Sequence, residues 1–118
     1  MICQWMSQRK QTNMETLLFI GIASYYSVAG CLGCSPTLTM ANGERLNDSA
    51  LTVALPPVEY RKYKNKYLLI TNPKTGKKVK AKVTDSGGFA KYNRVADLSL
   101  ATKNAIGCSN LCKVEIRK

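Results

Sequence analysis

Carboxylates must carry any acid–base chemistry in this chain, because its 118 residues include seven acidic side chains and no histidine. The missing histidine excludes a Ser-His-Asp triad and a histidine-rich zinc site. Asp85 ends an alternating run and precedes Ser86-Gly87-Gly88, a turn whose small side chains leave a carboxylate accessible. Glu44 follows Asn42-Gly43, a dipeptide typical of a tight turn, so it also projects from a loop.

Asp85 and Glu44 together form a candidate acid pair for glycoside chemistry. Cleavage of a glycosidic bond needs a carboxylic acid to protonate the leaving oxygen, usually with a second group that manages charge at the anomeric carbon. Phe89 follows the glycine turn, and its ring would suit the face of a sugar. The sequence does not give the separation of the two carboxyl groups, so retaining, inverting and non-hydrolytic routes all stay open. The structural alternatives are that Asp85 only starts a turn and that Glu44 is a solvated surface acid.

Asp97 and Ser99 are interpreted as structural residues. Residues 99–106 predict one short helix, in which the Ser99 side chain caps the first free amides and Gly107 ends the helix in a left-handed conformation. Asp97 would then place its charge near the helix start, where it complements the helix dipole, or it would orient Arg94.

The chain is strongly basic, with 18 lysine and arginine residues against 7 acids and a formal charge of +11. The positive electrostatic field of such a chain attracts any anionic partner, whether nucleic acid, an acidic membrane or a bacterial wall polymer. Two basic runs, 61–67 with its interleaved tyrosines and 74–82, fit single-stranded nucleic acid, and equally a solvated hairpin face that lysine keeps soluble. No apolar run approaches the roughly 20 residues of a transmembrane helix.

Four of the five cysteines form a Cys-x2-Cys pair and a Cys-x3-Cys pair near opposite ends of the expected domain: Cys31, Cys34, Cys108 and Cys112. Two disulfides suit a small secreted domain, whereas a four-thiolate zinc site suits an intracellular one, and the spacings permit both. We favour disulfides and expect no bound metal or cofactor. Cys3 would stay unpaired.

Residues 1–18 are interpreted as an N-terminal tail or degenerate leader, and residues 19–118 as the folded domain. Residues 28–31 resemble a lipobox, but cleavage there would remove the first predicted strand. Further strands are expected at 51–55, 67–71, 78–83 and 113–117, between turn-forming segments. Val79, Ala81 and Val83 should share one face, as should Val114 and Ile116. These elements predict a small all-β barrel.

Five short blocks resemble, in order, those of the rare lipoprotein A family of double-psi β-barrels. They are Gly21-Ile22-Ala23-Ser24-Tyr25-Tyr26, Ala41-Asn42-Gly43-Glu44, Leu51-Thr52-Val53-Ala54, Val83-Thr84-Asp85-Ser86-Gly87-Gly88-Phe89 and Arg94-Val95-Ala96-Asp97-Leu98-Ser99. The resemblance implies a six-stranded double-psi barrel related to barwin and expansins, acting as a lytic transglycosylase on peptidoglycan. It implies Asp85 as the acid/base, assisted by Glu44, and these substrate-binding residues: Tyr25, Tyr26, Asn42, Gly87, Gly88, Phe89 and Arg94.

Two departures from the family pattern bear on activity. Leu55 stands where the family commonly has a histidine, and Ser86-Gly87-Gly88 stands where it has Arg-Gly-Pro. The alternative is therefore a non-catalytic, expansin-like domain that binds cell-wall glycan. The family setting implies an extracytoplasmic monomer without a nucleic-acid partner, in which Cys31 and Cys34 would each bridge to Cys108 or Cys112.

Overall fold

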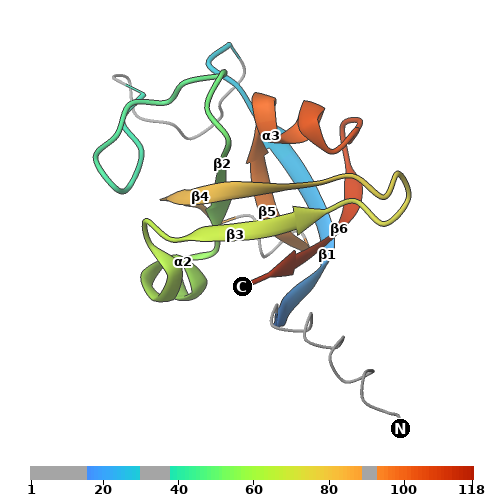
Figure 1. Cartoon of the computed structure of the whole chain (residues 1–118). Helices are drawn as coiled ribbons and strands as arrows, with labels where there is room; N and C mark the ends of the chain where they lie inside the picture. Colours follow the sequence, from blue (N-terminus) through green and yellow to red (C-terminus); the bar gives the residue numbers. More distant parts are fainter. Residues whose placement is uncertain (1–15, 30–37, 89–92) are drawn as a thin grey trace, which may run out of the picture.

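The computed structural model describes residues 16–29, 38–88 and 93–118. Within these ranges six strands form a closed barrel in the order β1-β5-β2-β4-β3-β6, accompanied by two short helices (Figure 1). The elements are β1 (Leu17–Tyr26), β2 (Thr52–Leu55), α2 (Pro57–Tyr63), β3 (Tyr67–Thr71), β4 (Lys78–Ser86), β5 (Arg94–Ser99), α3 (Leu100–Ala105) and β6 (Cys112–Arg117). No described helix is long and apolar enough to cross a membrane.

Two of the strand pairs are parallel, and this sets which strand ends meet. Strand β1 runs parallel to β5, and β2 runs parallel to β4, whereas the remaining neighbours are antiparallel. In the closed ring, β2 therefore lies across the barrel from β6. Strands β4 and β5 therefore run in opposite directions on either side of β2, and the carboxyl end of β4 faces the middle of β5 across β2.

The barrel interior holds the main hydrophobic core, and the sequence predicted which faces point into it. Ala81 and Val83 of β4 are fully buried with Val79 packed against the same core, and Val114 and Ile116 of β6 are fully buried as well. Burying a side chain of this size contributes about 1.5–3 kcal/mol. The predicted inward faces of both strands are confirmed.

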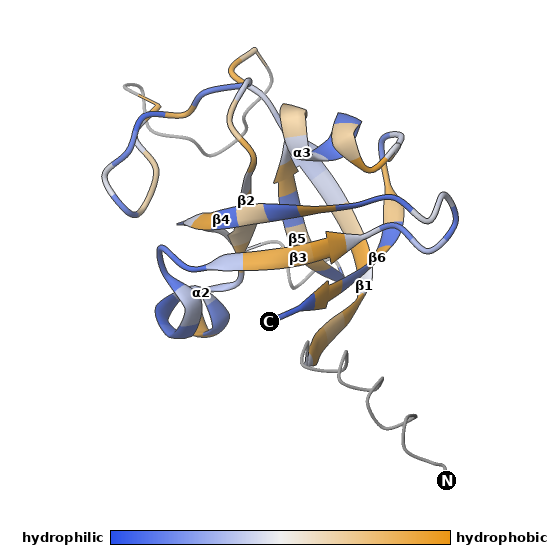
Figure 2. Cartoon of the chain, in the orientation of Figure 1, coloured by the Kyte–Doolittle hydropathy of each residue, from blue (hydrophilic) through white to orange (hydrophobic). Residues whose placement is uncertain are grey.

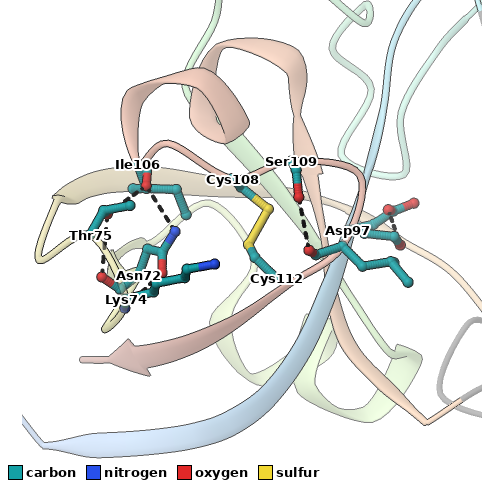
Figure 3. The surroundings of a disulfide bond; sticks show 10 residues. Asn72, Lys74, Thr75, Asp97, Ile106, Cys108, Ser109 and Cys112 are labelled. Atoms are coloured by element: carbon teal, nitrogen blue, oxygen red, sulfur yellow. Dashed lines mark hydrogen bonds between the residues drawn. A yellow bond between two sulfur atoms is a disulfide. The ribbon is translucent and has the colours of Figure 1, made fainter.

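The predicted cap of helix α3 is also confirmed. The Ser99 hydroxyl accepts a hydrogen bond from the Thr102 N–H at 3.2 Å, and Gly107 adopts a φ of 68° after the helix. The carbonyl of Ile106 then accepts hydrogen bonds from the Asn72 amide at 3.0 Å and the Thr75 hydroxyl at 2.9 Å (Figure 3). The turn after β3 is thereby fastened to the end of α3.

Helix α2 is an element that the sequence patterns did not predict. It begins with Pro57 at the first helical position, where the missing N–H is harmless, and carries basic residues in its last turn. Tyr60 and Tyr63, three residues apart, pack against the core from one helix face, and the Tyr63 ring meets Phe19 edge-on at 6.3 Å. The first part of the basic run 61–67 is therefore helix, and the hairpin interpretation was wrong there.

A second, smaller apolar cluster lies on the outer face of the sheet. It comprises the buried residues Tyr26, Met40, Leu46 and Ala54, with Leu38 packed against them. Residues 38–46 form a hairpin-like loop here, closed by the Leu46 N–H to the Leu38 carbonyl at 2.7 Å and by a turn at Gly43, where φ is 94°. This 38–46 loop is fixed against the sheet beside the end of β4.

The disulfide pairing differs from the expected one. Cys108 bonds to Cys112, with their Cα atoms 5.6 Å apart, within the short connection between α3 and β6 (Figure 3). This separation lies within the range that a disulfide requires. The expected bridges from these two residues to Cys31 and Cys34 are therefore wrong, as is a zinc site that uses all four thiolates. Cys31 and Cys34 themselves lie outside the described residues.

Candidate functional site

Two carboxylates lie in one row across four neighbouring strands. On β2, Ala54 is in register with Asp85 of β4 on one side and with Asp97 of β5 on the other, and Asp97 is in register with Ser24 of β1. We call Asp85, Ala54, Asp97 and Ser24 the acidic row. With strands about 4.8 Å apart, the Cα atoms of the two aspartates lie about 10 Å apart. Ala54 between them is buried in the second apolar cluster, against Tyr26, Met40 and Leu46.

Asp85 is held by two backbone amides. Its Oδ1 accepts hydrogen bonds from the Ser86 N–H at 2.8 Å and from the Ala41 N–H at 2.9 Å. Asn42 adds a backbone bond from its N–H to the Thr84 carbonyl at 3.0 Å. Through Oδ1, the carboxylate therefore joins the end of β4 to the 38–46 loop. Asp85 itself is partly exposed.

Asp97 belongs to the same row, although the sequence interpretation placed it at a helix start. The helix is capped by Ser99, and the Asp97 carboxylate instead accepts a hydrogen bond from the Ser24 hydroxyl at 2.6 Å. Burial raises the pKa of Asp97 above its usual value, and the charge of Asp85 raises it further. The Ser24 hydrogen bond and the charge of Arg94 oppose this rise. The signal available in the sequence was alternation, which places Ser24 and Asp97 opposite the core-facing Ala23, Ala96 and Leu98.

The negative charge of Asp85 contributes to raised pKa values at two tyrosines, Tyr26 and Tyr60. The Tyr26 hydroxyl lies 3.1 Å from the Thr52 hydroxyl, and burial raises the pKa of Tyr26 to about 12, with the charges of Asp85 and Asp97 adding to the rise. Tyr60 of α2 is the described residue whose buried side-chain oxygen has no hydrogen-bond partner. Burial raises the pKa of Tyr60 also, and Asp85 contributes. An unsatisfied hydroxyl therefore lies within the electrostatic reach of Asp85.

Glu44 lies beside the row and is engaged with a cation. Its Oε2 is 2.6 Å from the Lys82 Nζ on the outer face of β4. Asn42 stabilises the turn that carries Glu44, because the Asn42 Oδ1 accepts from the Glu44 N–H and its amide donates to Asn65, both at 2.9 Å. Glu44 and Asn42 thus hold the 38–46 loop against β4.

The other expected binding residues are divided between the row and the rest of the fold. Arg94 begins β5 near Asp97. Gly87 and Gly88 follow Asp85 after Ser86, and the Gly87 N–H donates to the Leu55 carbonyl at 3.2 Å. Tyr25 packs instead against the main core and lies under the Lys103 ammonium, 4.8 Å from its ring centroid. Phe89 lies outside the described residues.

This arrangement can accept hydrogen bonds and can exchange a proton. Burial and the nearby charge of Asp85 both disfavour the ionised form of Asp97, and this raises its pKa. The row therefore presents a hydrogen-bond acceptor at Asp85 and, at Asp97, a second carboxyl group whose protonated form is favoured by its surroundings.

The comparisons with known proteins identify the fold. No protein-family model matches the chain, and no curated protein matches it. Among solved structures, the chain is similar to the apo crystal structure of an expansin from Clavibacter michiganensis, with a TM-score of 0.62 and 23% sequence identity. The match covers 87% of this chain and 49% of the expansin chain, so this chain spans about half the length of that protein. The fold is therefore expansin-like.

Proposed function

We propose that this chain is a double-psi barrel domain that binds glycan strands of the cell wall through the acidic row, as a non-catalytic, expansin-like module. The observation that carries the proposal is the row itself: Asp85 and Asp97 flank Ala54 in a fold shared with an expansin. Carboxylates accept hydrogen bonds from sugar hydroxyls, and charge-assisted bonds of this kind are about twice as strong as neutral ones.

The Cys108–Cys112 disulfide supports an oxidising, extracytoplasmic location, because disulfides persist in such compartments.

A lytic transglycosylase is the second candidate, and the raised pKa of Asp97 favours it. In that reaction a neutral carboxyl group at the row donates its proton to the glycosidic oxygen as the bond to C1 breaks. The C6 hydroxyl of muramic acid then bonds to C1 and returns its proton to the carboxylate, leaving a 1,6-anhydro end. Asp97 would be the proton donor, and Asp85 would stabilise the charge that develops at C1.

The test compares binding and turnover in matched variants. Intact and peptide-stripped peptidoglycan would be incubated with the wild-type chain and with Asp85→Asn, Asp97→Asn and Glu115→Gln, followed by co-sedimentation and mass spectrometry of released sugars. Glu115→Gln is the control, because it removes one charge from β6, across the barrel from β2. Asparagine keeps the oxygen that accepts the bonds at each aspartate, so the fold should persist.

We expect both aspartate variants to bind peptidoglycan at least tenfold more weakly than the wild type, while the control binds equally well. Wild-type release of 1,6-anhydro products that Asp97→Asn abolishes would establish the enzyme instead. Absence of both binding and release in the wild type would refute both candidates.

A further inference from the structure

The outer face of β4 carries a row of lysines that the glycan site does not use. Lys78, Lys80 and Lys82 alternate along the strand with core-facing apolar residues, so all three point outward. Lys78 and Lys80 are exposed, and neither forms an ion pair with any acid in the described part of the chain. Lys82 is neutralised by Glu44. We call these three residues the lysine row.

The strands beside the lysine row carry no unpaired acid among the described residues and little aromatic surface. On β3, Tyr67, Leu69 and Thr71 stand opposite Lys82, Lys80 and Lys78 in turn. On β6, Arg117 lies on the other side of Leu69 and Glu115 on the other side of Thr71, and these two residues form an ion pair at 3.0 Å. Two more lysines, Lys74 and Lys77, occupy the connection between β3 and β4, which Figure 2 colours as hydrophilic.

Lys78 and Lys80, the two lysines of the row without an ion pair, lie in the first half of β4, and the acidic row crosses its other end. Lys78 is the first residue of the strand, and Asp85 is near its end. Seven residues of extended chain separate them, which corresponds to about 23 Å. A ligand of the lysine row therefore does not need to contact the acidic row.

The spacing of the free cations indicates the chemistry of the partner. Alternate residues of a strand are about 6.6 Å apart. In a chain of glycerol units joined by phosphodiesters, six backbone bonds separate successive phosphorus atoms, the same number that separates alternate Cα atoms. When extended, such a chain repeats its charge about every 7 Å. The distance between Lys78 and Lys80 along the strand therefore matches the distance between two consecutive phosphates of such a chain.

Nucleic acid has a similar phosphate repeat, but this face favours a polymer without bases. Proteins that bind single strands stack successive bases on several aromatic side chains. On the outer face of β3 and β4, Tyr67 is the aromatic residue that the strand alternation places outward, and it is 62% exposed beside the neutralised Lys82. The two free lysines have no ring opposite them.

We propose that the lysine row binds a linear polyol-phosphate polymer of the cell wall, with consecutive phosphates at Lys78 and Lys80. This second site would hold the domain on the wall by charge, apart from glycan recognition at the acidic row.

The experiment measures affinity for a glycerol-phosphate polymer as a function of salt. The variant Lys78→Gln/Lys80→Gln is compared with Arg61→Gln/Lys62→Gln, which removes the same charge from exposed positions on α2. The lysine-row variant should lose at least tenfold in affinity at low salt. Its slope of log affinity against log salt should fall by about 1 for each lysine removed. The α2 variant should stay within about threefold of the wild type in the same assay.

Three results would overturn the proposal: wild-type affinity in the lysine-row variant, an equal loss in both variants, or tighter binding of an oligonucleotide with the same number of phosphates. The first two assign binding elsewhere or to net charge, and the third assigns the face to nucleic acid. Peptidoglycan stripped of phosphate polymers should still bind the lysine-row variant. If neither the wild type nor the variant binds this stripped peptidoglycan, while the wild type still binds the glycerol-phosphate polymer, the proposed glycan function is wrong and the proposal for the lysine row is retained.

Discussion

Removal of the Cys108–Cys112 disulfide should lower the stability of the barrel by a modest, calculable amount. The bond spans a sequence separation of 4, so the loop that it closes contains about five residues. In the chain-entropy model, a loop of this size restricts the unfolded chain by about 7 cal/mol/K, or about 2 kcal/mol at 25 °C. With about 0.2 kcal/mol/K of unfolding entropy for roughly 100 ordered residues, the thermal midpoint should fall by about 10 °C.

The assay is thermal unfolding followed by circular dichroism, on the wild type with and without reductant and on Cys108→Ala/Cys112→Ala. Cys31→Ala/Cys34→Ala is the matched control. Reductant should lower the midpoint of the Cys31→Ala/Cys34→Ala control by about 10 °C, because this variant retains the Cys108–Cys112 bond. Trypsin cleavage after Lys103 and Lys113 would release residues 104–113 with both cysteines, two hydrogens lighter without reductant. A peptide cross-linked to residues 31–34, or a midpoint insensitive to reductant, would refute the reasoning.

Three further changes test the site and the framework that holds it. Asp97→Asn should raise the free energy of unfolding at pH 7 but much less at pH 3. The pKa of Asp97 is higher in the folded chain than its ordinary value of 3.8, so the wild type loses stability as pH rises from near 3.8 through the raised pKa. Urea unfolding at both pH values measures this difference, and a larger gain at pH 3 would contradict it. Gly21→Ala should destabilise by about 1–3 kcal/mol, since the new Cβ would lie 2.5 Å from a methyl carbon of Val95, and Val95→Ala in the same chain should restore stability. Ser99→Ala should reduce stability by about 2 kcal/mol in chemical denaturation, because the buried hydroxyl both caps α3 and donates to the Ala50 carbonyl at 2.8 Å; a loss below about 0.5 kcal/mol would contradict this role.

Much of the framework was predictable because it depends on local patterns. The alternation of charged and apolar residues in 78–83 and 113–117 specified which side chains enter the barrel, since successive strand residues must point to opposite faces. Ser99 and Gly107 marked the ends of α3 through capping and left-handed geometry. Helix α2 was missed because its two core-facing tyrosines lie within a basic run, and seven residues show little helical periodicity.

The sequence by itself also determined the acids from which the site had to be built, because a chain without histidine leaves carboxylates as its proton carriers. Only the tertiary structure decided which acids meet. Parallel pairing of β2 with β4, and antiparallel pairing with β5, aligns Asp85 and Asp97 on either side of Ala54, although 12 positions separate the two aspartates along the chain. Packing of the 38–46 loop against the end of β4 set Glu44 against Lys82. Strand register is a property of the closed barrel, so no local pattern contains it.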